Sequence, residues 1–125
     1  MPSFGTLKAD TLTHSTAGSL ATNYVVEGTA KMWVHIAMYT PAITDSFNTS
    51  SLTDAGTGQG NVSMTNALTS SIRTANCFAG SCVSGRTASF NSTGNTASVV
   101  AIQLTNSSGT SQDEDGKGVV WGDLA

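Results

Sequence analysis

The sequence predicts an all-β fold, an antiparallel β-sandwich or jelly-roll-like domain with an extended N-terminal arm. Ser and Thr make up 36 of the 125 residues and Gly another 13, while helical periodicity is nearly absent. These residue types disfavour helices or favour strands and turns. Six or seven short segments with strand character are separated by turns rich in Gly, Asn and Ser, which is the spacing of sandwich and barrel domains.

The strongest strand signal is KMWVHIAMY at residues 31–39. Side chains alternate along a strand, so the even-numbered residues 32–38, all apolar, are predicted to face the core. The odd-numbered residues 31–39 share the other face, which mixes large rings with polar ends and suits a boundary between chains. We therefore expect Trp33, His35 and Tyr39 at a subunit interface.

The rest of the chain divides into an arm and a series of shorter elements. Residues 1–30 are predicted to be the arm, because their few leucines are scattered and cannot bury themselves, and residues 31–125 are predicted to be the β-sandwich domain. We expect a hairpin next, with a strand at 43–52, a turn at 53–60 and a strand at 61–66 whose Val62 and Met64 face inward. A strand and long loop at 70–86, a short strand at Phe90 and a turn at 91–96 are expected to follow. The last elements expected are a strand buried on both faces at 98–104, a turn at 106–117 and a terminal strand at 119–122.

Composition excludes several functions. Only 10% of the residues are charged, against about 25% in a typical soluble domain, and the net charge is −3 with five Lys and Arg. Nucleic-acid binding needs clustered basic residues, so it is not expected. No signal-peptide pattern and no membrane-length apolar run are visible, which predicts synthesis in a cytosol without membrane insertion. The charge-poor surface suits closely packed subunits better than a free monomer.

Residues for catalysis or metal binding are not in a usable pattern. The two histidines lack metal-ligand spacing to Cys77 and Cys82, the acids lie in predicted turns, and the glycines at 56, 58 and 60 precede no helix. The acid run at 113–115 is either a hard-cation site or a solvated turn. The two cysteines are either a disulfide closing a turn or reduced thiols in a loop. We expect no enzyme, metal or cofactor.

A recognition surface is predicted instead around the irregular 70–90 region. Arg73, Phe78 and Arg86 fall there, and exposed arginine and aromatic side chains are the usual anchors of binding surfaces. The alternative is that Phe78 and Phe90 plug small cores beneath long loops.

Several segments together resemble a module common in virion appendage proteins of tailed phages, especially marine ones. That module typically reads "KAWVNF", then "DSFNVSSITDNGTG", then "YTVNFT". The resemblance covers most of the chain in order and is specific between residues 31 and 65. The segments that carry it are 6–12, 31–36, 43–58, 61–65 and 119–123. His35 stands where the family often has Asn.

The resemblance implies a β-rich domain of a tail fibre or tail appendage, usually a homotrimer and often with a role in binding a host-surface glycan or protein. It implies no catalytic residue. The expected location is the virion, with the arm joining the chain to other virion proteins. A short chain of this kind is alternatively a head decoration or cement protein that stabilises the capsid.

Overall fold

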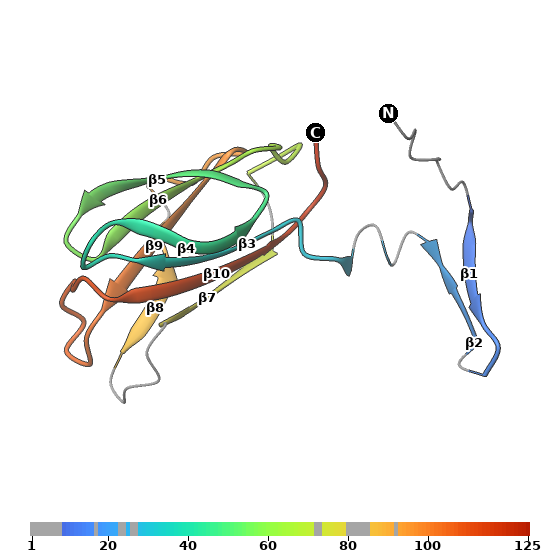
Figure 1. Ribbon diagram of the computed structural model, residues 1–125, viewed down its shortest axis with the longest axis horizontal. Helices are drawn as coiled ribbons and strands as arrows, with labels where there is room; N and C mark the ends of the chain where they lie inside the picture. Colours follow the sequence, from blue (N-terminus) through green and yellow to red (C-terminus); the bar gives the residue numbers. More distant parts are fainter. Residues whose placement is uncertain are drawn as a thin grey trace.

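The structure is a computed structural model that describes residues 9–16, 18–22, 25, 28–71, 74–79, 86–91 and 93–125. Two four-stranded antiparallel sheets pack together as a β-sandwich (Figure 1). The first sheet has the order β4-β3-β10-β7, formed by Ala42–Phe47, Met32–Ala37, Asp115–Trp121 and Thr74–Ala79. The second has the order β5-β6-β9-β8, formed by Thr49–Gly56, Gln59–Met64, Val99–Thr105 and Thr87–Phe90. The all-β sandwich predicted from the sequence is thus confirmed.

The described part of the arm is a separate two-stranded hairpin. Strand β1, Thr11–His14, pairs with β2, Gly18–Ala21, in an antiparallel register that places Leu12 opposite Leu20. The extended arm predicted for residues 1–30 therefore folds back on itself in this stretch. Residues 1–8 lie outside the described residues.

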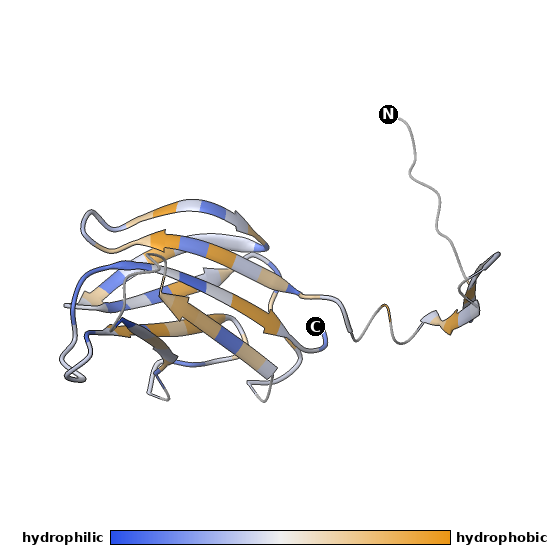
Figure 2. Ribbon diagram, turned by 90° about the horizontal axis from the view of Figure 1, so that it is seen from below, coloured by the Kyte–Doolittle hydropathy of each residue, from blue (hydrophilic) through white to orange (hydrophobic). Residues whose placement is uncertain are grey.

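The core lies between the two sheets and is aliphatic. Figure 2 shows hydrophobic and hydrophilic residues alternating along several strands, and the predicted inward set of β3 and Met38 is indeed almost fully buried. Val62 and Met64 face inward as predicted. The buried core residues are Met32, Val34, Ile36, Met38, Val62, Met64, Leu68, Val100, Ile102, Leu104 and Val120.

Glycines at inward positions make room for these long side chains. A Cβ on Gly116 would lie 3.1 Å from Leu104 Cδ2, and a Cβ on Gly118 would lie 3.1 Å from Ile102 Cδ1. Strand β10 therefore presents backbone to the core at two of its inward positions, so that side chains from the opposite sheet fill that space at normal packing density.

The segment predicted as one strand at 43–52 is two strands in different sheets. The chain leaves β4 and enters β5 through a single residue, Asn48, whose φ of 55° lies in the left-handed region. The hairpin β5–β6 is confirmed, but its turn is shorter than predicted. Strand β5 continues to Gly56 and β6 begins at Gln59, so the turn proper is Thr57 and Gly58.

The predicted turn at 106–117 is also shorter than expected. Strand β10 begins at Asp115 and lies between β3 and β7. Glu114, expected in either a solvated turn or a cation site, is only 5% exposed and pairs with Arg86. A carboxylate can be buried in this way when a cation faces it, which composition alone does not reveal.

Candidate functional site

The two sheets differ in what they present to solvent. The outward positions of the second sheet are largely Ser, Thr, Asn and Gln; Gln59 pairs with Gln103, which in turn pairs with Ser89. The first sheet instead presents aromatic side chains. We call its outer surface the aromatic face, formed by Trp33, His35, Asp45, Phe47, Phe78, Lys117 and Val119.

Strand register brings the aromatic face together in two rows. In the first row, Trp33 lies between its cross-strand partners Phe47 and Val119. Phe47 is 54% exposed and Trp33 38%, well above what a core position would allow. Cross-strand neighbours have Cβ atoms about 5 Å apart, so these side chains form one continuous apolar strip.

The second row is mixed. His35 lies opposite Asp45 on β4 and Lys117 on β10, and Lys117 in turn lies opposite Phe78, which is 52% exposed. Within the described part of the chain, the side chains of His35 and Lys117 make no hydrogen bond or ion pair, and Asp45 only accepts a bond from the neighbouring Ser46 amide at 2.9 Å. The row therefore holds unused hydrogen-bonding groups beside exposed rings.

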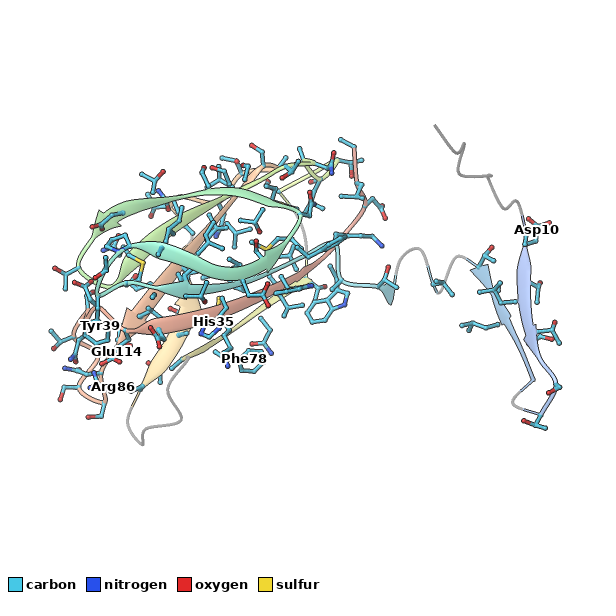
Figure 3. The ribbon with its side chains drawn as sticks, viewed as in Figure 1. Asp10, His35, Tyr39, Phe78, Arg86 and Glu114 are labelled. Carbon is cyan, nitrogen blue, oxygen red and sulfur yellow. The ribbon has the colours of Figure 1, made fainter. Side chains whose placement is uncertain are left out.

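A second cluster lies at one end of the sandwich, where Tyr39, Arg86 and Glu114 gather (Figure 3). Arg86 Nη1 is 2.6 Å from Glu114 Oε1, and the same nitrogen donates to the Gln112 side-chain carbonyl. The carboxylate contact is an ion pair without the angles of a hydrogen bond. A hydrogen bond with Glu114, aided by desolvation, raises the pKa of Tyr39, whose ring is otherwise 65% exposed. This cluster anchors the 112–115 segment to β8.

A third feature is a mainly apolar groove of about 650 Å³ where the arm joins the sandwich. Val25, Ala30 and Lys31 from the arm junction line it, together with Phe47 and Leu124 from the sandwich. Lys31 is 8% exposed rather than outward-facing as predicted, and its Nζ donates to Thr29 Oγ1 at 2.9 Å. The alternation predicted over residues 31–39 therefore holds from Met32 to Tyr39 and fails at Lys31.

The residues predicted for two separate surfaces are regrouped. Trp33 and His35, expected at a subunit interface, share the aromatic face with Phe78, which was expected to bind a host surface. Tyr39 lies beyond the end of β3 and joins Arg86 in the end cluster. Arg73 lies outside the described residues. Of the two phenylalanines, Phe78 is exposed, whereas Phe90 packs against the core.

Neither family models, nor curated proteins, nor solved structures match this chain. Its function is therefore argued from its own residues.

Sequence reasoning missed four members of the aromatic face: Asp45, Phe47, Lys117 and Val119. The alternation of Asp45 and Phe47 was visible, but their position beside Trp33 depends on the β3–β4 register and on the bulge at His35 and Ile36. Lys117 was assigned to a turn. Lys117 and Val119 alternate with Gly116 and Gly118, which is the pattern of a strand. The pattern indicates a strand only if the two glycines face the core, as the structure shows they do.

The described ranges contain no group of three or more His, Cys, Asp or Glu side chains able to hold a metal ion. No helix in the part of the chain that was searched has the length and apolarity to cross a membrane. Cys77 is a free thiol that points from β7 toward the core rather than into a loop, and Cys82 lies outside the described residues.

Proposed function

We propose that this chain is a structural protein of a tailed-phage virion, a homotrimeric tail-fibre or tail-appendage module whose aromatic face contacts the host surface. The observation that carries the proposal is the asymmetry of the sandwich: one outer face is polar, and the other exposes Trp33, Phe47 and Phe78. Exposed aromatic clusters on soluble proteins mark interaction sites. The resemblance of residues 31–65 to virion appendage modules supports the same conclusion.

We assign the contacts between copies to the arm rather than to the aromatic face. A two-stranded hairpin is marginally stable alone, and its Leu12 and Leu20 remain 41% and 46% exposed. The apolar groove lies where the arm joins the sandwich. In a symmetric assembly whose arms converge at this end, the hairpin of one copy reaches the groove of the next and covers it. Phe47 lies at the groove and is covered with it, which leaves Trp33 and Phe78 as the rings that contact the host surface. Other virion proteins are the further partners of the arm.

The aromatic face is a poor candidate for permanent contact between copies. Asp45, His35 and Lys117 would lose their hydration in such an interface, and desolvated charges without partners destabilise it. The same groups are well suited to a host ligand that supplies their hydrogen bonds on contact. For Trp33 and His35, which the sequence assigns to a subunit interface, we therefore propose a recognition role.

Two measurements test the proposal. Light scattering on the purified chain at micromolar concentration is expected to give three times the 12.7 kDa chain mass; a stable, folded monomer would remove the trimer. Imaging of labelled chains on purified particles is expected to place them on the tail. Labels on the head would support capsid decoration instead, and absence from particles would end the virion assignment.

A further inference from the structure

A recess of about 330 Å³ opens on the aromatic face, across strands β4, β3 and β10. Its volume lies at the lower end of the range typical of small-ligand pockets. Trp33 and Val119 contribute to it from the first row of the aromatic face, and His35, Asp45 and Lys117 contribute from the second row. The lining residues are Trp33, Val34, His35, Asp45, Lys117, Gly118 and Val119.

The lining groups provide a flat apolar ring together with hydrogen-bond donors and acceptors. The indole of Trp33 is 38% exposed, so its ring is accessible from solvent. Asp45 accepts the Ser46 amide with Oδ1 and keeps Oδ2 as a further acceptor, Lys117 has three donors, and the His35 imidazole donates and accepts. Asp45, His35 and Lys117 reach the recess from β4, β3 and β10, and Trp33 also lies on β3, so the set is held by the sheet rather than by a loop.

The balance of charges excludes most ligand classes. One lysine and one aspartate, on either side of His35, give no net positive charge to attract a polyanion, so nucleic acid and phosphate are disfavoured. A single carboxylate is too few for Ca²⁺ or Mg²⁺, which take six or more oxygen ligands. One histidine with one carboxylate is also too few for Zn²⁺, which takes at least three protein ligands. A purely apolar ligand would leave the charged groups desolvated and unpaired. A fitting ligand is neutral overall, rich in hydroxyl groups, and flat on one apolar side.

We infer that this recess is a saccharide site in which a pyranose ring stacks its C–H face on Trp33 while ring hydroxyls bond to Asp45, His35 and Lys117. A pyranose has this combination of an apolar face and a rim of groups that both donate and accept hydrogen bonds. The inference rests on the proposed function, and it names the host ligand as glycan rather than protein.

The test uses the full-length chain and a printed array of neutral oligosaccharides as the probe. The wild-type chain is expected to be captured by at least one saccharide, which is then titrated by calorimetry. Trp33→Ala is expected to weaken binding by about tenfold or more, as for an aromatic anchor at the centre of a recognition site. Trp33→Phe should retain much of the affinity because it keeps a ring. Asp45→Ala should also weaken binding, since it removes an acceptor.

Phe78→Ala is the matched control. Phe78 is exposed on the same face, next to Lys117, but does not line the recess. A saccharide site predicts that this variant binds like the wild type, whereas general apolar adhesion predicts equal losses for Phe78→Ala and Trp33→Ala. Circular dichroism on each variant checks that the fold is intact, and Asp45→Ala serves as the loss-of-binding variant if Trp33→Ala fails to fold.

Three results would overturn the inference: capture by no saccharide, equal loss in the Phe78→Ala and Trp33→Ala variants, or capture that survives periodate cleavage of the sugar diols. The last result would point to something other than the saccharide as the bound species. Particle imaging and light scattering are independent of these readouts. A chain that is trimeric and located on the tail but binds no saccharide would refute the saccharide site alone, while a monomer absent from particles would refute the proposed function.

Discussion

Asn48 is the residue through which the chain passes from one sheet to the other. Its Nδ2 donates to the carbonyls of Lys31 at 2.9 Å and Asn66 at 3.0 Å, and its Oδ1 accepts from the Asn66 amide at 2.7 Å. Asparagine also tolerates the left-handed φ of 55° better than any residue except glycine. One side chain thus satisfies three backbone groups from two segments that line the groove.

Asn48→Ala is expected to lower the free energy of unfolding by about 3 kcal/mol, because it leaves these backbone groups without a partner and strains the backbone. Asn48→Gly loses the same hydrogen bonds but relieves the strain, so its loss should be smaller. Urea denaturation monitored by circular dichroism measures both. Equal stability of Asn48→Ala and the wild type would show that the bridge contributes nothing.

Because of Cys77, the stability of the fold is expected to depend on pH in the alkaline range. Burial raises the pKa of its thiol from 9.0 to about 12. Above pH 9 the unfolded chain ionises this thiol while the folded chain keeps it neutral, so stability present below pH 9 is lost as the pH rises toward 12.

In a Cys82→Ser background, the stability conferred by Cys77 relative to Cys77→Ala is expected to fall by about 1.4 kcal/mol between pH 8 and pH 10. Urea denaturation at both pH values gives this difference, and the comparison cancels tyrosine ionisation. A difference that does not change with pH would mean that water reaches the thiol in the folded chain.

At the scale of elements, the turn of the β5–β6 hairpin is fixed against the neighbouring strand. Gly58 has a φ of +68°, and a Cβ there would lie 2.5 Å from the Leu104 carbonyl oxygen and 2.7 Å from the Gln112 nitrogen. The Gly58 amide donates to Asp113 Oδ1 at 2.6 Å, and its carbonyl accepts from the Leu104 amide at 2.7 Å. The hairpin, β9 and the segment before β10 therefore meet at a position that only glycine fits.

Gly58→Ala is expected to destabilise the fold by about 3 kcal/mol or more, because rigid backbone atoms must move to admit the methyl group. Gly109→Ala is the matched control: Gly109 also has positive φ, +76°, but nothing lies within 4 Å of its Cβ position. Its cost should be about 1 kcal/mol, from backbone strain alone. Thermal melting of both variants separates steric clash from strain; equal shifts would contradict the close approach.

The elements that could be predicted from the sequence are those that a local residue pattern determines. Strands β3 and β9 were recognised because their apolar alternation or density is a local property, and the β5–β6 hairpin because glycines punctuate it. The start of β10 was missed because its inward positions at Gly116 and Gly118 carry no apolar side chain. The burial of Glu114 was missed because its partner Arg86 is distant in sequence.

The candidate site was harder to predict than the fold for the same reason. Trp33, His35 and Phe78 were singled out individually, since large exposed rings are uncommon and informative. Their grouping, and the addition of Asp45 and Lys117, follow from the registers of β3 with β4 and of β10 with both β3 and β7. Register between distant strands depends on the packed core and cannot be derived from a local pattern.

At the scale of the whole molecule, the sandwich is self-sufficient in its core but the arm is not. The eleven buried core residues all come from residues 32–120, so the hairpin contributes none of them. The two faces of the hairpin differ: Leu12 and Leu20 form one cross-strand pair, and Thr13 and Ser19, joined by a 3.0 Å hydrogen bond, form the next pair on the opposite face. An assembly role for the arm must therefore act through the leucine face.

The double variant Leu12→Ser, Leu20→Ser is expected to shift the particle mass in light scattering from a trimer toward a monomer at micromolar concentration, because it removes the apolar surface that covers a neighbour's groove. The melting transition of the sandwich should remain, since its core is intact. Thr13→Ala with Ser19→Ala is the control on the opposite face and should leave the trimer unchanged. If the leucine variant stays trimeric while Trp33→Ala becomes monomeric, the copies associate through the aromatic face. The arm would then not be the element that joins the copies.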